Sequence, residues 1–355
     1  MIEAISIQNF KSVEKLKLDL GRITVLIGAN GSGKSNILEG IAMGAAAANN
    51  KLENEFLASR GIRVTAPQLM RSAFEKESTE NNVFFQLFKN EILLAIILQH
   101  DNAFPFFPWT YSSFVEDLKP GTIIAATQGM GSFEENIKFD FLLYAPENNK
   151  IRNFSEEAQI QPLGIRGEGL FKLLTYLEED EKEEIQKHLN LIDWFDGFEI
   201  PNNLGINEKR LQIKDRYIDD SFMHLIDQRS TNEGFLFLLF YLTLIVSKYT
   251  PKFFAIDNID NSLNPALCSK LLKVMVELAK KYDKQIILST HNPAILDGLD
   301  LEDEEQKLYV IRRNIQGATK ARLVKKTKVK EGEEPIKLSE QFMRGYLGGL
   351  NKNTF

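Results

Sequence analysis

The segment from residue 23 to residue 35, ITVLIGANGSGKS, constrains the fold more than any other part of the chain. The apolar run ITVLIG over 23–28 predicts a buried strand, and SNILEGIAMGAAAA from Ser35 predicts the helix that follows. The letters between them, GANGSGKS, match the pattern G-x-x-x-x-G-K-[S/T]. Because a strand, a glycine-rich loop and a helix in this order cradle phosphate groups, we expect a nucleotide site here.

The residue types in this loop fit the chemistry of a triphosphate. Gly28, Gly31 and Gly33 let the main chain curl so that N–H groups point at phosphate oxygens. Lys34 would bring a positive charge to the β- and γ-phosphates, and the Ser35 hydroxyl is a suitable Mg²⁺ ligand. The alternative is a chance match, which the surrounding strand and helix disfavour.

Composition places the chain among folded globular proteins, at 355 residues with 43% hydrophobic and 26% charged residues. A net charge of −6 argues against a protein that coats nucleic acid by charge alone. A single cysteine, Cys268, excludes an internal disulfide and agrees with a reducing cytoplasm. The longest apolar run, FLFLLFYLTLIV over 235–246, is too short to span a membrane and predicts a buried helix. The N-terminus lacks the pattern of a signal peptide.

Hydrophobic periodicity predicts an alternation of strands and helices. Strands are expected at 2–9, 16–19, 83–99 (two, with a turn at 89–90), 137–145, 252–257, 285–290 and 307–313, and helices at 167–195, 235–248 and 265–282. The aromatic and proline-rich segment 103–114 is expected to be a loop or an insertion edge. Strands that alternate with helices in the last third favour a largely parallel sheet covered on both faces.

Two polar residues stand where predicted buried strands end. KFFAID places Asp257 at the tip of its strand, where it could complete a Mg²⁺ shell opposite Ser35. An ordinary turn is the alternative for Asp257, since aspartate favours turns. STHNP places His291 after the next strand, where it could contact the γ-phosphate or the attacking water. A structural histidine is the alternative, but ligands of open α/β sheets bind at this end of the strands.

The residues 2–41, from IEAISIQNFKS to GANGSGKSNILEGI, resemble the opening of SMC, RecF and OLD-type ATPases. Those proteins begin with a strand, an NFKS-like turn, a second strand and GxNGSGKSN. The resemblance implies ATP and Mg²⁺ as ligands, with Lys34, Asp257 and His291 acting on the phosphates. The residues that it adds to the nucleotide-binding set are Asn30, Ser32 and Asn36. The family's D-loop matches 260–265, with Asn264 in place of the usual histidine.

A weaker match concerns the ABC signature, which precedes the second acidic strand in that family. In RSTNEGFLFLLF, Gly234 fits the signature glycine and Asn232 replaces the serine. The resemblance implies that this segment binds the γ-phosphate of ATP held by a second copy, so that two ATP molecules join a homodimer. The alternative is a plain helix cap supplied by Ser230, Thr231 or Asn232. Both interpretations can hold together.

The chain departs from the family at Asn258, where a glutamate usually serves as the general base. An amide cannot accept a proton at neutral pH, although it can orient water. We therefore expect slow hydrolysis, unless Asp260 or His291 helps, and a long-lived ATP-bound dimer that acts as a switch or scaffold. Gln68 and Gln86 are candidates for the family's Q-loop glutamine.

The resemblance implies the fold class α/β: a P-loop NTPase of the ABC-ATPase head type, with a mainly parallel sheet, an antiparallel β subdomain and a helical insertion. We expect one domain over 1–355, with an N-terminal lobe at about 1–150, the insertion at about 151–225 and a C-terminal lobe at about 226–355. OLD proteins carry a C-terminal nuclease, but only about 40 residues follow Arg313 and they lack its acidic set. A nuclease or toxin effector would therefore be a separate chain.

The leading hypothesis is an ATP-gated regulatory dimer that holds or releases an effector, in bacterial anti-phage defence. A RecF-like DNA-binding ATPase in repair is the alternative, and a transporter subunit fits less well because of the long insert and the NFKS-type start. The basic segment 319–330 could contact DNA or an acidic partner, or form a solvated hairpin. The aromatic residues Phe104, Phe106, Phe107 and Trp109 could form a partner surface or pack in the core.

Overall fold

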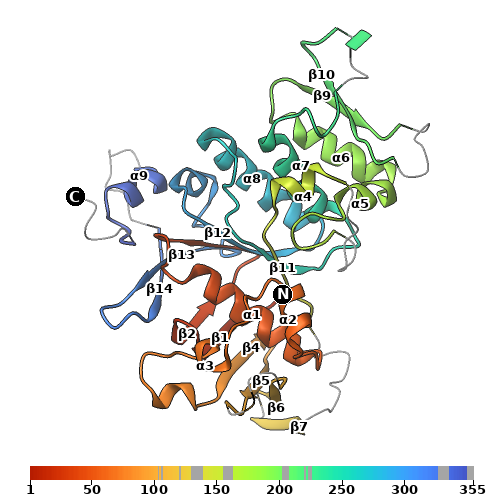
Figure 1. Cartoon of the computed structure of the whole chain (residues 1–355). Helices are drawn as coiled ribbons and strands as arrows, with labels where there is room; N and C mark the ends of the chain where they lie inside the picture. Colours follow the sequence, from red (N-terminus) through yellow and green to blue (C-terminus); the bar gives the residue numbers. More distant parts are fainter. Residues whose placement is uncertain are drawn as a thin grey trace.

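The computed structural model describes most of the chain. The described residues are 1–102, 104, 107–119, 121–128, 139–154, 163–201, 208–219, 221–222, 226–326 and 336–349. Over these residues the strands form two six-stranded sheets and one two-stranded sheet. The two large sheets lie at different levels of the molecule, with a helical layer above them (Figure 1).

The lower sheet is antiparallel and comes from the first 128 residues. Its strands are β1 (Ala4–Phe10), β2 (Val13–Asp19), β4 (Val83–Lys89), β5 (Ile92–Gln99), β6 (Thr110–Asp117) and β7 (Thr122–Gln128). Their order is β2-β1-β4-β5-β6-β7. The turn between β4 and β5 uses Asn90 and Glu91, whose φ angles are 49° and 66°. The predicted antiparallel subdomain and the predicted pair of strands over 83–99 are confirmed.

The central sheet is mainly parallel and joins the start of the chain to its last third. Its strands are β3 (Ile23–Ile27), β8 (Leu142–Tyr144), β11 (Phe253–Ile256), β12 (Gln285–Thr290), β13 (Gln306–Arg313) and β14 (Thr319–Leu323). The order is β14-β13-β3-β12-β11-β8, and β14 alone of these pairs in antiparallel fashion. Ile27, the last residue of β3, pairs with Thr290 and Val310. This register places the loops after β3, β11 and β12 at one edge of the sheet.

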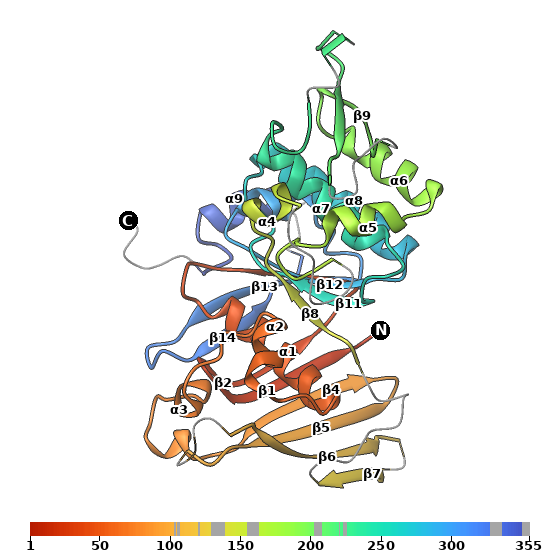
Figure 2. The ribbon, with the colours of Figure 1, turned by 45° about the vertical axis from the view of Figure 1, so that its right-hand side comes forward.

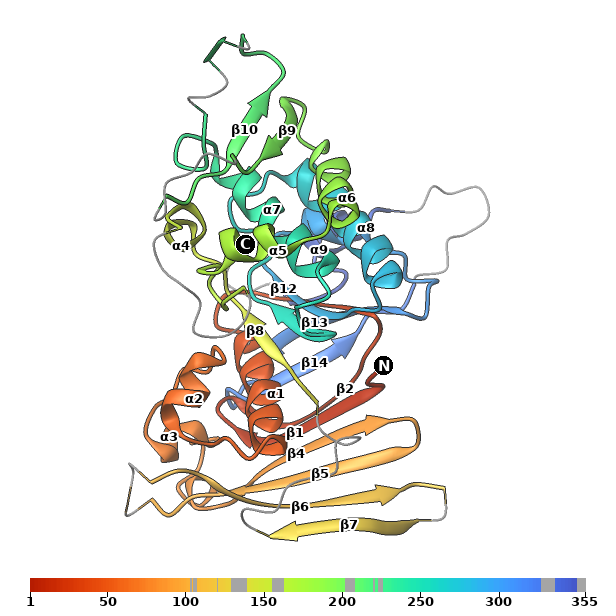
Figure 3. The same ribbon diagram turned by 90° about the vertical axis from the view of Figure 1, so that its right-hand side faces the viewer.

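Alternating side chains of the central sheet supply two separate cores. Val25 and Ile256 point into the upper core, beneath the helical layer, whereas Leu26 and Ala255 point into the lower core. The lower core lies between the two sheets, and helix α1 (Lys34–Ala48) runs through it, as Figures 2 and 3 show. A parallel sheet covered on both faces is what the sequence predicts.

Helix α1 approaches the antiparallel sheet closely because it carries glycine where the two meet. A Cβ atom at Gly44 would lie 2.5 Å from the ring of Phe85 on β4, and one at Gly40 would lie 2.9 Å from Ile7 on β1. Any larger side chain at Gly44 would push the helix away from the sheet. The glycines therefore fix the distance between α1 and the sheet, and with it the position of the loop that starts the helix.

The remaining helices lie mostly in the upper layer. They are α2 (Asn54–Ser59), α3 (Pro67–Met70), α4 (Asn148–Arg152), α5 (Leu170–Tyr176), α6 (Glu179–Leu189), α7 (Glu233–Val246), α8 (Pro265–Lys281) and α9 (Leu338–Met343), with short 3₁₀ helices at η1 (Glu77–Thr79) and η3 (Pro293–Gly298). Helix α7 is the predicted buried helix, and its side chains are buried from Phe235 to Val246. Helix α8 confirms the helix predicted at 265–282.

The single helix predicted over 167–195 is wrong. The segment forms α5 and α6, and β9 (Phe195–Glu199) begins at its end, paired with β10 (Gln212–Asp215). Leu177 has an extended backbone, and Glu178 starts α6 with a capping box in which its side chain and that of Glu181 bond to each other's main chain. Glutamate at the cap is an uncommon choice, so the helix start is inconspicuous in the sequence.

The aromatic segment divides between core and surface. Trp109 is buried, and it packs against the guanidinium of Arg71 with 4.8 Å between the charge and the ring. Phe104 and Phe107 stack on each other and are exposed. Residues 110–117 form strand β6, so the loop predicted over 103–114 is too long. Phe106 lies outside the described residues, as do 137 and 138 of the strand predicted at 137–145, of which 142–144 are confirmed.

The described part of the basic segment supports the hairpin interpretation. Strand β14 folds back on β13, Lys320 lies 3.5 Å from Glu14, and Lys326 pairs with Glu302. Residues 327–330 lie outside the described part of the chain. No helix in the described ranges combines the length and apolar character that crossing a bilayer requires. The division into two lobes and an insertion stays a prediction.

Candidate functional site

The glycine-rich loop runs from β3 into the first turn of α1. Gly31 and Gly33 have φ angles of 74° and 104°, which side chains other than glycine rarely adopt. At Gly33 a Cβ would also lie 2.0 Å from the Thr319 hydroxyl. No side chain caps α1, and its first turn carries no acidic residue. The N–H groups at the start of α1 therefore stay available for an anion.

Lys34 lies beneath this loop, with 4% of its surface exposed. Its Nζ donates to the carbonyl oxygens of Gly28 at 2.8 Å and Ala29 at 3.2 Å. Burial lowers the pKa of the Lys34 ammonium to about 8, against the opposing attraction of Asp257 and Asp260. A buried cation held at the floor of an amide-lined loop suits the charge of a phosphate chain.

His291 reaches the same loop from the end of β12. Its Nδ1 lies 3.1 Å from Lys34 Nζ and 3.0 Å from the Gly28 carbonyl oxygen. Burial and then the charge of Lys34 lower the pKa of His291, which keeps the ring neutral. The ammonium favours the tautomer whose bare Nδ1 accepts from Lys34, because an N–H at Nδ1 would face the positive charge of Lys34 at 3.1 Å. The outer nitrogen, Nε2, then carries the proton.

Ser35 and Asp257 meet across the edge of the central sheet. The Ser35 hydroxyl donates to Asp257 Oδ2 at 2.8 Å. The hydroxyl of buried Ser289, from β12, donates to the other carboxylate oxygen, and it also accepts from the N–H of Asn258 at 2.9 Å. Ser289 therefore holds the carboxylate with one oxygen facing Ser35. Asn258 has a φ of 54°, a conformation that asparagine tolerates better than most residues.

Asp260 is held by the end of β12. Its Oδ1 accepts from the Thr290 hydroxyl at 2.7 Å and from the His291 N–H at 3.3 Å. Sequence patterns offered Asp260 as a possible helper, but Ser289 and Thr290 received no role. The signal for them was present, since both polar residues follow the apolar run 286–288 and stand directly before His291.

One further observation indicates that the loop is suited to bind a phosphate chain. The Ser32 hydroxyl is buried and has no hydrogen-bond partner among the described residues. A buried hydroxyl without a partner carries a desolvation cost that a phosphate oxygen would remove. Ser32, the uncapped N–H groups of α1 and Lys34 are therefore groups that could hold an anion. Ser35 and Asp257 beside it offer the oxygen ligands that Mg²⁺ takes in nucleotide sites.

The outer side of the glycine-rich loop contacts residues for which the sequence predicts no role in the site. Thr319, the first residue of β14, bonds to the Ser32 carbonyl oxygen at 3.2 Å and to the Ser12 hydroxyl at 2.7 Å. Arg313, the last residue of β13, donates to the Gly31 carbonyl oxygen at 2.8 Å. Both ends of the β13–β14 hairpin turn are therefore attached to the loop. No local pattern could link Ser12 to Thr319, because 307 positions separate them.

The side chain of Asn36 is engaged within the protein. Its Nδ2 donates to Ser12 Oγ at 2.6 Å, and its Oδ1 accepts from Arg63 at 3.1 Å. An open cavity of about 390 Å³ adjoins these residues. Its lining residues are Lys11, Ser12, Asn36, Arg63, Thr65, Leu69, Arg71, Ala73, Phe74 and Arg313. Asn36 thus lies at the boundary between the phosphate loop and this cavity, and Asn30 is exposed at the loop's tip.

A buried carboxylate, that of Glu39, binds two of the residues that line this cavity. Glu39, on the second turn of α1, is 1% exposed and pairs with Lys11 and with Arg63 Nε at 2.5 Å. Burial lowers the pKa of Lys11, while the charge of Glu39 opposes that shift. The pair connects α1 to the turn between β1 and β2 and to the segment after α2.

Replacing Glu39 with alanine is expected to lower the free energy of unfolding by about 3 kcal/mol, because it leaves the largely buried ammonium of Lys11 without its carboxylate partner. Urea unfolding followed by circular dichroism would measure this. The matched control is Glu302→Ala, which removes an exposed partner of Lys326 and should cost less than about 1 kcal/mol. Equal effects of the two substitutions would show that the Glu39 pair is no more important than a surface pair.

The second group of predicted residues lies apart from the phosphate loop. Asn232 caps α7 by accepting from the Phe235 N–H at 2.8 Å, so the cap interpretation is confirmed. Gly234 packs against the 260–265 segment, where a Cβ would lie 3.1 Å from the Ser262 carbonyl oxygen. Asn264 caps α8 in the same way. A cavity of about 650 Å³ adjoins Asn232, Gly234 and Asn264, and no residue of the phosphate loop lines it.

The two glutamine candidates occupy different places. Gln68 lies on α3, beside the segment that lines the 390 Å³ cavity. Gln86 lies in the middle of β4 and pairs with Ser6. The assignment of a Q-loop glutamine stays a prediction.

The sequence matches two protein families. A family described as "AAA ATPase domain" matches residues 1–188, which is more than half of the chain. A second, described as "AAA domain, putative AbiEii toxin, Type IV TA system", matches residues 232–297. These two ranges contain the phosphate loop in the first case and Asn232, Asp257 and His291 in the second. A search of curated proteins finds no match.

Solved structures show a similar fold. One is described as an SMC head bound to the C-winged helix domain of ScpA; it has 16% identity and a TM-score of 0.51, with 91% of this chain and 97% of that chain covered. Another is an SMC head with an extended coiled coil, bound to the C-terminal domain of ScpA from Pyrococcus furiosus; it has 14% identity and a TM-score of 0.51, covering 91% and 96%. At these identities the likeness concerns the fold alone.

Proposed function

Because the chain belongs to the AAA ATPase domain family, we propose that it is an ATP-driven switch whose two copies close on ATP and control a separate partner protein. Its fold is that of an ABC/SMC-type head, of the RecF and OLD-like kind. The activity is that of an ATPase in general terms.

The hydrogen bond between Ser35 and Asp257 is the main observation that supports an ATP site in this chain. It joins the start of α1 to the end of β11, at the edge where the phosphate loop and His291 also lie. Lys34, Ser32 and the free N–H groups of α1 would bind the phosphates of ATP. Ser35 and Asp257 would hold Mg²⁺, which supplies charge neutralisation on the β- and γ-phosphates. His291, with its proton on Nε2, would donate to the γ-phosphate or to water.

ATP affinity is expected to fall about tenfold between pH 7 and pH 9, because Lys34 loses its proton above its pKa of about 8. ATP raises the pKa of the ammonium that it contacts, so binding at pH 9 takes up about one proton. Titration calorimetry in two buffers of different ionisation enthalpy would measure both quantities. A Lys34→Arg variant, whose guanidinium stays charged, should show a flat affinity from pH 7 to pH 9. The same fall in both proteins would exclude Lys34 as its cause.

The separation of the two residue groups supports a dimer. Asn232 and Gly234 line a cavity away from the phosphate loop of their own chain. If this segment binds ATP, as the resemblance implies, the ATP must be one that a second copy holds. The N-terminus of α7, whose fourteen residues begin at Glu233, presents N–H groups suited to that phosphate.

ATP with Mg²⁺ is expected to double the mass of the protein in solution, as measured by light scattering during gel filtration. A Gly234→Asp variant places a carboxylate where the phosphate of the second copy would lie. It should bind ATP normally and remain monomeric, because the phosphate loop is unaltered. A wild-type protein that binds ATP but stays monomeric would contradict the dimer and leave the ATP site intact.

The proposal also includes a partner protein and a biological setting. We expect a nuclease or toxin on another chain and a role in bacterial anti-phage defence, acting in the cytoplasm, by analogy with OLD-type ATPases. Protection from phage that requires both Lys34 and a neighbouring gene would test it. The DNA-binding alternative receives less support, since Lys320 and Lys326 are near Glu14 and Glu302.

A further inference from the structure

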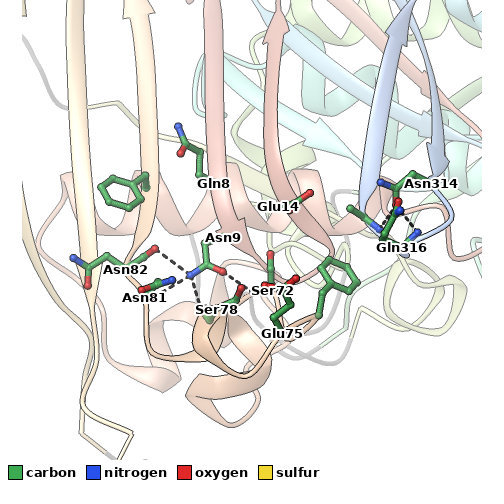
Figure 4. A pocket seen from close by; sticks show the side chains of 13 residues that line it. Gln8, Asn9, Glu14, Ser72, Glu75, Ser78, Asn81, Asn82, Asn314 and Gln316 are labelled. Atoms are coloured by element: carbon green, nitrogen blue, oxygen red, sulfur yellow. Dashed lines mark hydrogen bonds between the residues drawn. The ribbon is translucent and has the colours of Figure 1, made fainter.

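A polar cleft of about 530 Å³ lies between the end of the antiparallel sheet and the β13–β14 hairpin turn (Figure 4). Its size is within the range of roughly 300–1,000 Å³ that is usual for ligand sites. Gln8 and Asn82 line one side, and Asn314 and Gln316 of the hairpin line the other. No residue of the phosphate loop lines it, so it is a separate cavity.

Some polar groups of the cleft serve the fold and others do not. The Asn9 amide donates to the carbonyl oxygens of Ser78, Asn81 and Asn82, which holds the segment 72–82 in place. The side chains of Gln8, Asn82 and Gln316 make no hydrogen bond to any described residue. Carboxamides of this kind can donate to and accept from a main chain, so they suit an extended polypeptide.

The charged side chains that line the cleft are both acidic. Its thirteen lining residues include Glu14 and Glu75 but no lysine or arginine. Glu14 is 3.5 Å from Lys320, whereas Glu75 is exposed and has no ion pair among the described residues. The neighbouring residues 76–80, KESTE, add one more negative charge in total. A ligand that carries positive charge is therefore favoured.

Two aromatic rings at the cleft are exposed to solvent. Phe74 is 40% exposed and Phe84 is 37% exposed. Phe74 also lies against the hairpin, where a Cβ at Gly317 would be 3.1 Å from its ring. Rings in this position can cover the aliphatic stems of lysine or arginine and attract their charges.

From these features we propose that the cleft binds a lysine- or arginine-containing polypeptide segment of a partner protein. The inference deepens the proposed function, on which it rests for its link to ATP. Asn314 and Gln316 belong to the turn whose two ends, Arg313 and Thr319, bond to the phosphate loop. A shift of that loop on binding ATP would move one wall of the cleft. Partner affinity would then depend on the nucleotide.

The test uses a phage-displayed library of random linear peptides, selected against the full chain without nucleotide. Selected peptides are expected to contain lysine or arginine. They should bind Glu75→Lys at least about tenfold more weakly than wild type. The matched control, Glu277→Lys, makes the same charge change on exposed α8 and should bind them as wild type does. ATP should change the affinity by about fivefold or more in wild type and leave it unchanged in Lys34→Ala.

The outcomes separate the two proposals. Peptides that are acidic or apolar, or that bind Glu75→Lys and wild type equally, would overturn the cleft proposal, as would a failure to select any peptide. The ATP-dependent dimer could still form in each of these cases. Conversely, peptides that depend on Glu75 but ignore ATP would support the cleft and remove its link to the nucleotide.

Discussion

Replacing Asn258 with glutamate is expected to raise ATP turnover by roughly 10²-fold or more, because a positioned general base contributes about 10²–10⁴-fold. Asn258 directly follows Asp257, and its N–H is held by Ser289. Its own amide cannot accept a proton, so the wild-type protein lacks a base at this position. A carboxylate there would be able to take the proton of the attacking water. Steady-state release of phosphate would measure the change.

The backbone at this position gives the experiment its control. Asn258 has a φ of 54°, and a longer side chain without asparagine's tolerance for this region is strained by about 1 kcal/mol. Asn258→Gln has the same strain and nearly the same size as the glutamate variant, but it has no base. Glutamate should accelerate hydrolysis and glutamine should not. Wild type hydrolysing ATP faster than the glutamate variant would refute the idea of a slow switch.

Removing the ammonium of Lys34 with Lys34→Ala is expected to lower the rate of ATP hydrolysis by roughly 10²–10³-fold, the range for losing one charge-stabilising donor. Lys34 is 4% exposed and its ammonium lies directly beneath the loop, so water cannot replace its charge fully. Affinity for ATP should fall as well, since a hydrogen bond to a charged group contributes about 1.5–3 kcal/mol. Binding and single-turnover measurements would separate the two effects.

Thermal melting distinguishes a role of Lys34 in binding ATP from a role in stabilising the fold. Burial holds the pKa of Lys34 at about 8, which shows that its charge is costly to keep in the folded protein. Lys34→Ala should therefore melt no earlier than wild type, in the absence of nucleotide. The control Lys273→Ala removes an exposed lysine of α8 and should alter neither melting nor hydrolysis. A Lys34→Ala protein that hydrolyses ATP normally would contradict the proposed site.

The phosphate loop and the strand ends were predictable because their geometry depends on neighbours in sequence. Glycines at 31 and 33 permit the positive φ angles of the loop, and apolar runs define the strands on either side. The rule that ligands bind at the carboxyl ends of parallel strands then brings Asp257 and His291 near Lys34. The structure places these three residues together. Their roles in catalysis stay predictions.

The prediction of a single helix over 167–195 is wrong, and the physical reason lies in how the second helix begins. Helical periodicity continues across Leu177 and Glu178, so apolar spacing alone does not reveal the break. The break depends on a capping box made by two glutamates. In the sequence these glutamates cannot be told from ordinary charged surface residues. Helix α6 ends at Leu189, and Phe195 begins a strand that needs β10 as its partner.

The sequence by itself determined the phosphate loop, the parallel order of strands and helices, and the absence of a glutamate after Asp257. Tertiary structure alone decided the contacts of Ser12 with Thr319 and of Glu39 with Arg63, and it placed Asn232 away from Lys34. The physical reason is range. Backbone conformation and hydrophobic periodicity act within a few residues, whereas a hydrogen bond between a turn residue and a strand residue 307 positions apart exists only after the sheets have packed.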